Sequence, residues 1–131
     1  MKKKTQTPAF SENISCVCRM FDEAIKDYQW NSEKIVEMDR LTQDYLHSLE
    51  LDGLKYEERA KIATQLSRCR QERREHKDTV MILEPLVQYL GTDKGRQLLN
   101  LLKEALGKTR KAEEKMENRV YYPRVLGRDT Q

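Results

Sequence analysis

The sequence contains few of the residues that interrupt helices and no long run of apolar ones. Its 131 residues include five Gly and three Pro, too few for a turn-rich β-sandwich or barrel. No segment approaches the ~18–20 apolar residues that span a bilayer. The basic residues 2–4 precede no apolar run, so we do not expect them to form a signal peptide. We expect one small all-α domain in the cytoplasm.

The sequence also lacks the motifs of common enzyme and metal sites. It has no phosphate-binding glycine loop, dinucleotide fingerprint, HExxH pair or nucleophile elbow. Its three cysteines, Cys16, Cys18 and Cys69, cannot all pair within the chain, which favours reduced structural thiols. Cys16 and Cys18 would lie about 200° apart around a helix, which is poor geometry for tetrahedral zinc. We expect no catalysis, metal or cofactor.

Charge is abundant and nearly balanced. Apolar residues make up 37% of the chain and charged residues 36%, with 25 basic against 22 acidic side chains and a net charge of +3. This balance does not by itself predict nucleic-acid binding. The location of the positive charge therefore matters more than its total.

Two long helices are predicted from apolar residues spaced three and four apart. The first begins at Ser11, whose hydroxyl can cap the helix, and about 40 residues of helix span roughly 60 Å. Asp52 and Gly53 indicate a turn, and the second helix begins near Tyr56. The first stripe consists of Ile14, Val17, Phe21, Ala24, Tyr28, Asn31, Ile35, Met38, Thr42, Tyr45 and Leu49. The second consists of Ile62, Leu66, Cys69, Arg73, His76, Val80, Leu83, Val87 and Leu90.

The second helix contains Pro85, which should kink it or end it early because proline donates no backbone hydrogen bond. Gly91 is expected to end it, and Thr92 or Asp93 to cap the next helix. A third helix is predicted over residues 93–117. Its stripe consists of Leu98, Leu102, Ala105, Thr109, Ala112 and Met116, widened by Leu99, Leu101 and Leu106.

The chain ends are predicted to differ from this helical domain. Residues 1–10 should form a flexible basic arm, residues 11–117 a single helical domain, and residues 118–131 an extended C-terminal arm. The fold class is therefore all-α, with a long antiparallel helical hairpin, a third helix and the arm. The third helix covers only part of such a hairpin, so we expect a homo-oligomer, most simply a two-fold dimer. Five leucines are candidates for its interface or equally for the intrachain core: Leu98, Leu99, Leu101, Leu102 and Leu106.

An antiparallel hairpin places the polar residues Arg73 and His76 opposite the layer of Tyr28 and Asn31. A buried, unpaired arginine costs several kcal/mol, so Arg73 needs a partner, and Asp27 or Glu23 could supply a carboxylate. The group could be a polar layer that sets the helix register. It could instead bind an anion, or be exposed to water.

Two basic segments supply the candidate ligand-binding residues. Residues 68–77 are rich in arginine, which suits bidentate contacts with phosphate, although such runs are more often solvated surface. The C-terminal arm interleaves arginine with tyrosine, which can stack on a base. The candidates are Tyr28, Asn31, Arg70, Arg73, Arg74, His76, Lys77, Arg119, Tyr121, Tyr122 and Arg124.

Three stretches of the sequence resemble small helical open reading frames of bacteriophages and prophages of Gram-positive bacteria. They are MDRLTQDYLH (residues 38–47), ATQLSRCRQERR (63–74) and YPRVL (122–126), and the resemblance covers residues from about 12 to 127. It implies only a viral or mobile-element origin and a bacterial host cytoplasm. Small proteins of that origin often counter host defences, by capturing a signalling nucleotide or by blocking a defence protein. The resemblance assigns no functional residue.

Together these observations predict a non-catalytic binding protein. Its partners would be a second copy of itself and an anionic small molecule, with a cyclic nucleotide as one candidate, which it would sequester as an anti-defence sponge. One alternative is an inhibitor that binds a host defence protein. A nucleic-acid-binding accessory protein is a further alternative, which the moderate net charge disfavours. No membrane partner is expected.

Overall fold

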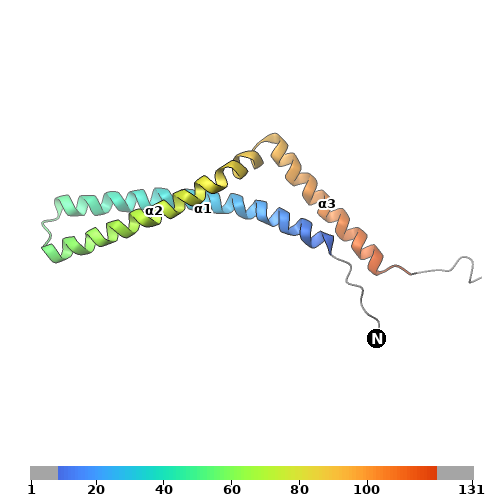
Figure 1. Ribbon diagram of the computed structural model, residues 1–131, viewed down its shortest axis with the longest axis horizontal. Helices are drawn as coiled ribbons and strands as arrows, with labels where there is room; N and C mark the ends of the chain where they lie inside the picture. The colour runs from blue at the N-terminus through green and yellow to red at the C-terminus, as the bar shows by residue number, and fades with distance from the viewer. Residues whose placement is uncertain (1–8, 121–131) are drawn as a thin grey trace, which may run out of the picture. The chain divides into compact units, whose positions relative to one another are not determined.

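The computed structural model describes residues 9–120, which form three α-helices and no strand (Figure 1). They are α1 (Phe10–Leu51), α2 (Tyr56–Leu90) and α3 (Asp93–Glu117). The all-α class is confirmed, and each helix begins within one residue of its predicted start. No helix in the described range combines the length and apolar composition needed to cross a bilayer. Most of both predicted arms lies outside the described residues.

The chain divides into two compact units. One comprises Met1–Arg19 with Gln97–Gln131, and the other comprises Met20–Arg96. In the second unit α1 and α2 run side by side (Figure 1). A single domain over residues 11–117 stays a prediction.

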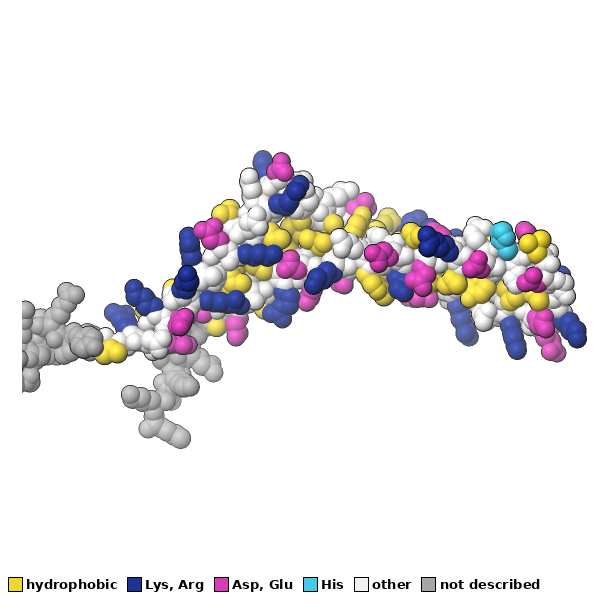
Figure 2. Space-filling model, turned by 180° about the vertical axis from the view of Figure 1, so that it is seen from behind, with side chains coloured by type: hydrophobic (Ala, Val, Ile, Leu, Met, Phe, Trp, Pro, Cys, Tyr) yellow, Lys and Arg dark blue, Asp and Glu magenta, His cyan; other side chains and the backbone are white. Residues whose placement is uncertain are grey.

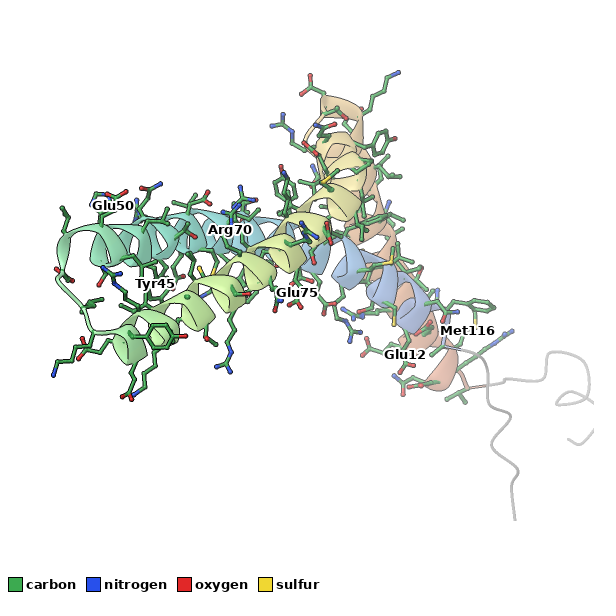
Figure 3. All side chains as sticks on the ribbon, turned by 60° about the vertical axis from the view of Figure 1, so that its left-hand side comes forward. Glu12, Tyr45, Glu50, Arg70, Glu75 and Met116 are labelled. Atoms are coloured by element: carbon green, nitrogen blue, oxygen red, sulfur yellow. The ribbon has the colours of Figure 1, made fainter. Side chains whose placement is uncertain are left out.

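Contacts between α1 and α2 follow the two predicted stripes. Ala24, Met38 and Cys69 are buried there with the polar residues Asn31 and His76. Asn31 contacts His76, and further along α1 Met38 contacts Cys69, so residue numbers rise on one helix as they fall on the other. The two helices therefore pack in opposite directions. In Figure 3, Tyr45 lies between them, whereas Glu50 points away from α2.

The start of α1 differs from the prediction for Ser11. The helix begins at Phe10, and the amide of Glu12 already donates to the carbonyl of Ala9 at 3.0 Å. The Ser11 hydroxyl does not accept from the first turn but donates to Glu113 Oε2 on α3 at 2.5 Å. The Ser11 amide donates to Glu113 Oε1 at 2.9 Å. A carboxylate from another helix thus satisfies a free amide that a local cap would otherwise serve.

Pro85 does not end α2, which continues to Leu90. The missing N–H leaves the carbonyl of Met81 without its usual partner four residues on. Both Met81 and Pro85 are exposed, so water can reach this carbonyl. An exposed position thus reduces the penalty that would otherwise favour an early end.

A close backbone approach joins α2 to α3. The Thr92 hydroxyl donates to the carbonyl of Tyr89 at 2.6 Å and accepts from the amide of Gly95 at 3.1 Å, so Thr92 is the cap. Gly95 is buried, and a Cβ there would lie 2.0 Å from the Tyr89 carbonyl oxygen. No described glycine has a positive φ. Gly95 is therefore required by space and not by backbone conformation.

The buried stripe of α3 is shifted from the predicted one. Leu98, Ala105, Ala112 and Met116 are exposed, which contradicts their place in the predicted buried stripe, and Leu101 is exposed as well. The partly buried positions are Leu99, Leu102, Leu106, Thr109 and Glu113. These residues also follow a three-four spacing. Leu102 and Thr109 were in the predicted stripe, and Leu99 and Leu106 were among the residues that widened it, whereas Glu113 was not predicted.

We predict opposite effects from adding a methyl group at two glycines of α3. Gly95→Ala should lower the free energy of unfolding by about 1–3 kcal/mol, because backbone atoms must move to admit the Cβ. Gly107→Ala meets no atom within 4 Å and should raise it by about 0.5–1 kcal/mol through helix propensity. Urea denaturation measures both, and equal effects would contradict the close approach at Gly95.

We also predict an acid-sensitive contact at the start of α1. The hydroxyl and amide of Ser11, helped by Arg110, lower the pKa of Glu113 below its ordinary value. The contact is therefore complete above the ordinary carboxyl range and is lost as the pH falls through the lowered pKa. In a carboxyl NMR titration, Ser11→Ala should raise the pKa of Glu113, whereas Ser15→Ala should leave it unchanged. An unchanged pKa in Ser11→Ala would exclude this contact.

Candidate functional site

The predicted polar layer of α1 and α2 forms two separate groups of contacts. The His76 cluster comprises Asn31 and His76 with Trp30, Lys34 and Glu72. The Asp39 cluster comprises Asp39, Arg70 and Arg73. The sequence predicted one site, and the structure divides its residues between these two places.

Asn31 fixes the orientation of His76. The Asn31 side-chain amide nitrogen donates to the carbonyl of Asp27 at 2.7 Å, so its oxygen faces the imidazole. That oxygen lies 2.7 Å from His76 Nδ1. Since an amide oxygen only accepts, Nδ1 carries the proton of this bond. The imidazole and the Trp30 ring are nearly perpendicular, at 76°, with centroids 5.3 Å apart, and the ammonium of Lys34 lies 5.4 Å from the Trp30 ring centre.

The other imidazole nitrogen, Nε2, is buried and has no hydrogen-bond partner in the described part of the chain. The carboxylate of Glu72 approaches it to 3.5 Å from one turn earlier on α2. Buried polar atoms are usually satisfied, so this atom requires an explanation. His76 thus has one nitrogen, Nδ1, whose hydrogen bond to Asn31 fixes the ring, and a second, Nε2, that has no hydrogen bond in the described part of the chain.

Arg73 pairs with Asp39 and not with the expected Asp27 or Glu23. Its Nε donates to Asp39 Oδ1 at 2.6 Å, whereas Arg70 Nη1 lies 3.9 Å from the same oxygen. The Arg73 side chain is 24% exposed and the Arg70 side chain 52%. The length of the arginine side chain lets its guanidinium bypass the opposite position and reach a carboxylate about two turns along α1. Arg73 is thus held in the fold, while Arg70 is only loosely paired.

Cys69 occupies the seam next to this ion pair. Its buried thiol donates to the carbonyl of Met38 at 3.3 Å and contacts the Thr42 hydroxyl and the Met38 sulfur, each at 3.7 Å. These contacts agree with a structural cysteine. No group of three or more His, Cys, Asp and Glu that could hold a metal occurs among the described residues.

A shallow depression of about 300 Å³ adjoins the Asp39 cluster, open to solvent on one side. Its lining consists of Val36, Asp39, Arg40, Thr42, Gln43 and Arg70. In Figure 3, Arg70 lies beside α1, whereas Glu75 lies on the outer side of α2. Val36, Arg40 and Gln43 were not predicted. Their spacing along one side of α1 could have indicated them, but only with the position of Arg70 known.

A second depression, of about 470 Å³, lies at the end of α1 and is lined by Gln43, Asp44, His47, Ser48, Leu51 and Asp52. Its two carboxylates make it less suitable for an anion than the depression beside Arg70. The remaining predicted residues join neither cluster in the described range. Tyr28 is half-buried, and Arg74, Lys77 and Arg119 are exposed. Tyr121, Tyr122 and Arg124 lie outside the described residues.

No family model, curated protein or solved structure matched this chain. The resemblance to phage open reading frames therefore stays a prediction.

We predict that Asp39 and Arg73 are energetically coupled. Asp39→Ala should destabilise the fold by about 1–2 kcal/mol, because it leaves a partly buried guanidinium unpaired; the half-exposed carboxylate keeps the effect modest. In an Arg73→Met background the same substitution should cost much less. A double-mutant cycle by urea denaturation measures the difference, with the exposed Asp44→Ala as the control. Additive effects would rule out a structural ion pair.

Proposed function

We propose that this chain is a non-catalytic protein that binds and sequesters an anionic, nucleotide-like ligand through arginine side chains of a helical homo-oligomer. The proposal includes a helical hairpin as its scaffold, a phage origin, an anti-defence role and the bacterial host cytoplasm as its location. The observation that carries it is the depression beside the Asp39 cluster, which has two arginines on its border.

Arg40 and Arg70, the two arginines of the depression, differ from Arg73 because they are available to contact a ligand. Arg40 is exposed, and the only ion pair of Arg70 among the described contacts is its 3.9 Å approach to Asp39. A guanidinium presents paired donors that match the oxygens of phosphate or carboxylate. Gln43 adds an amide donor, and Val36 adds an apolar surface for a ring. These side chains supply the contacts that a nucleotide-like anion requires.

Asp39 makes the site selective for ligands that can compete with it. Its carboxylate is held by Arg73 at 2.6 Å and neutralises part of the local positive charge. A simple carboxylate would gain little from displacing the weak contact with Arg70, whereas a nucleotide adds further phosphate oxygens as acceptors and a ring that can contact Val36. This balance favours a phosphorylated ligand over a simple carboxylate.

The distribution of charge favours a discrete site over a nucleic-acid track. On the face shown in Figure 2, basic and acidic side chains alternate along the α1–α2 pair. Binding to a nucleic-acid backbone generally uses a continuous basic surface. A small anion needs only the local pair of arginines.

Self-association is supported by how little of the chain is buried. No large side chain in the described range is fully buried. Ile82 is 77% exposed, and Met81 and Tyr89 are also at least half exposed. A second copy would remove such apolar surface from water. The same exposed residues favour the second candidate function, which is inhibition of a host defence protein by direct binding.

We predict that Arg40→Gln and Arg70→Gln each weaken nucleotide binding at least tenfold, because each removes a charged donor. Native mass spectrometry of the protein purified from cells reports any retained ligand and the number of subunits together. Isothermal titration with cyclic and linear nucleotides then gives the affinities.

Arg59→Gln removes the same charge at the start of α2, and its affinity should equal that of the wild type. If both the Arg40→Gln and the Arg70→Gln variants bind nucleotide as tightly as the wild type, the ligand binds at another place on the chain. No binding of any nucleotide, together with retention of a cellular protein by the wild type, would favour the inhibitor.

A further inference from the structure

We propose that His76 and Glu72 form a binding site for a divalent transition-metal ion of the zinc class. The observation behind it is the buried Nε2 atom of His76, which has no hydrogen-bond partner and faces the Glu72 carboxylate at 3.5 Å. This site is separate from the Asp39 cluster and does not depend on the proposed anion binding.

The protonation state of the imidazole follows from Asn31. Because the Asn31 amide nitrogen donates to Asp27 O, its oxygen must receive the Nδ1 proton of His76. In a neutral imidazole this leaves Nε2 with an unshared electron pair. A metal-bound histidine typically donates its other N–H to an oxygen acceptor, which orients the ring and fixes the tautomer. Asn31 supplies such an acceptor here.

The separation of the two ligand atoms fits a shared metal ion. Zinc binds imidazole nitrogen and carboxylate oxygen at about 2.0–2.2 Å, so two tetrahedral ligands lie about 3.4 Å apart. Nε2 and Glu72 Oε1 are 3.5 Å apart. The residues are four apart on one helix, and the Glu72 side chain is 53% exposed, so it can move to admit the ion. Water would complete the coordination.

The charges around the pair do not oppose a cation strongly. Lys34, on α1, lies over Trp30 but is paired with Glu37 at 3.0 Å. Arg73, on α2, is paired with Asp39 at 2.6 Å. The positive charges of Lys34 and Arg73 are thus partly neutralised by carboxylates of the same unit. Two protein ligands predict modest affinity, and zinc is preferred over magnesium because one ligand is imidazole.

The test uses the full chain with Cys16→Ser and His47→Gln, which remove the exposed thiol and the other imidazole. Long-range ¹H–¹⁵N NMR should show the Nδ1-protonated tautomer of His76 at pH 8, and zinc chloride should shift the Nε2 resonance saturably. Zinc should also raise the melting temperature. Glu72→Gln should weaken zinc binding at least tenfold, whereas Glu75→Gln, on the outer side of α2, should leave it unchanged.

Three results would overturn the proposal. Zinc could leave the His76 resonances unchanged. Glu72→Gln could bind zinc as tightly as the parent. Acid alone, without any effect of zinc, could shift Nε2, which would show that this atom takes a proton only.

Discussion

The packing of α1 on α2 depends on a short stretch of polar contacts in an otherwise apolar seam. Two stripes of similar apolar residues can slide past each other by one heptad with little loss of buried area. The Asn31–His76 hydrogen bond and the Asp39–Arg73 ion pair do not tolerate such a shift, because each forms only when its two side chains lie within bonding distance of each other. A shift of either helix would leave a buried imidazole and a partly buried guanidinium unpaired, at a cost of several kcal/mol. These contacts therefore select one register among several of similar apolar burial.

The division between Arg73 and Arg70 follows from the same constraint. A guanidinium that sets the register cannot also be released to a ligand without loosening the helix pair. Arg73, which is the less exposed of the two, has the short contact with Asp39, and Arg70 has the long one. A single carboxylate thus secures one arginine for the fold and leaves its neighbour available. With the anion site that we propose, folding and binding would use different members of one arginine run.

The spacing of apolar residues predicted the helices and the seam of α1 and α2 because both depend on local periodicity. It could not predict which carboxylate pairs with Arg73, since a long side chain can reach partners about two turns apart. It missed the role of Glu113 because a charged residue on a helix surface is normally solvated, whereas here it bonds to Ser11. It missed Gly95 because the requirement arises from the backbone of Tyr89, which the sequence does not place. The depression beside the Asp39 cluster depends on Arg40 and Arg70 approaching from different helices, and periodicity alone does not fix that relation.

A polar layer that only sets register would be expected to satisfy all of its atoms. Both polar atoms of the Asn31 side chain are bonded in this way, since its nitrogen donates to Asp27 and its oxygen accepts from His76. His76 differs, because its buried second nitrogen has no hydrogen-bond partner among the described residues and lies 3.5 Å from the Glu72 carboxylate. Glutamine at position 72 could donate to that nitrogen and complete the layer with a neutral side chain. A glutamate there is instead suited to a positively charged occupant, which is the reasoning behind the metal site that we propose.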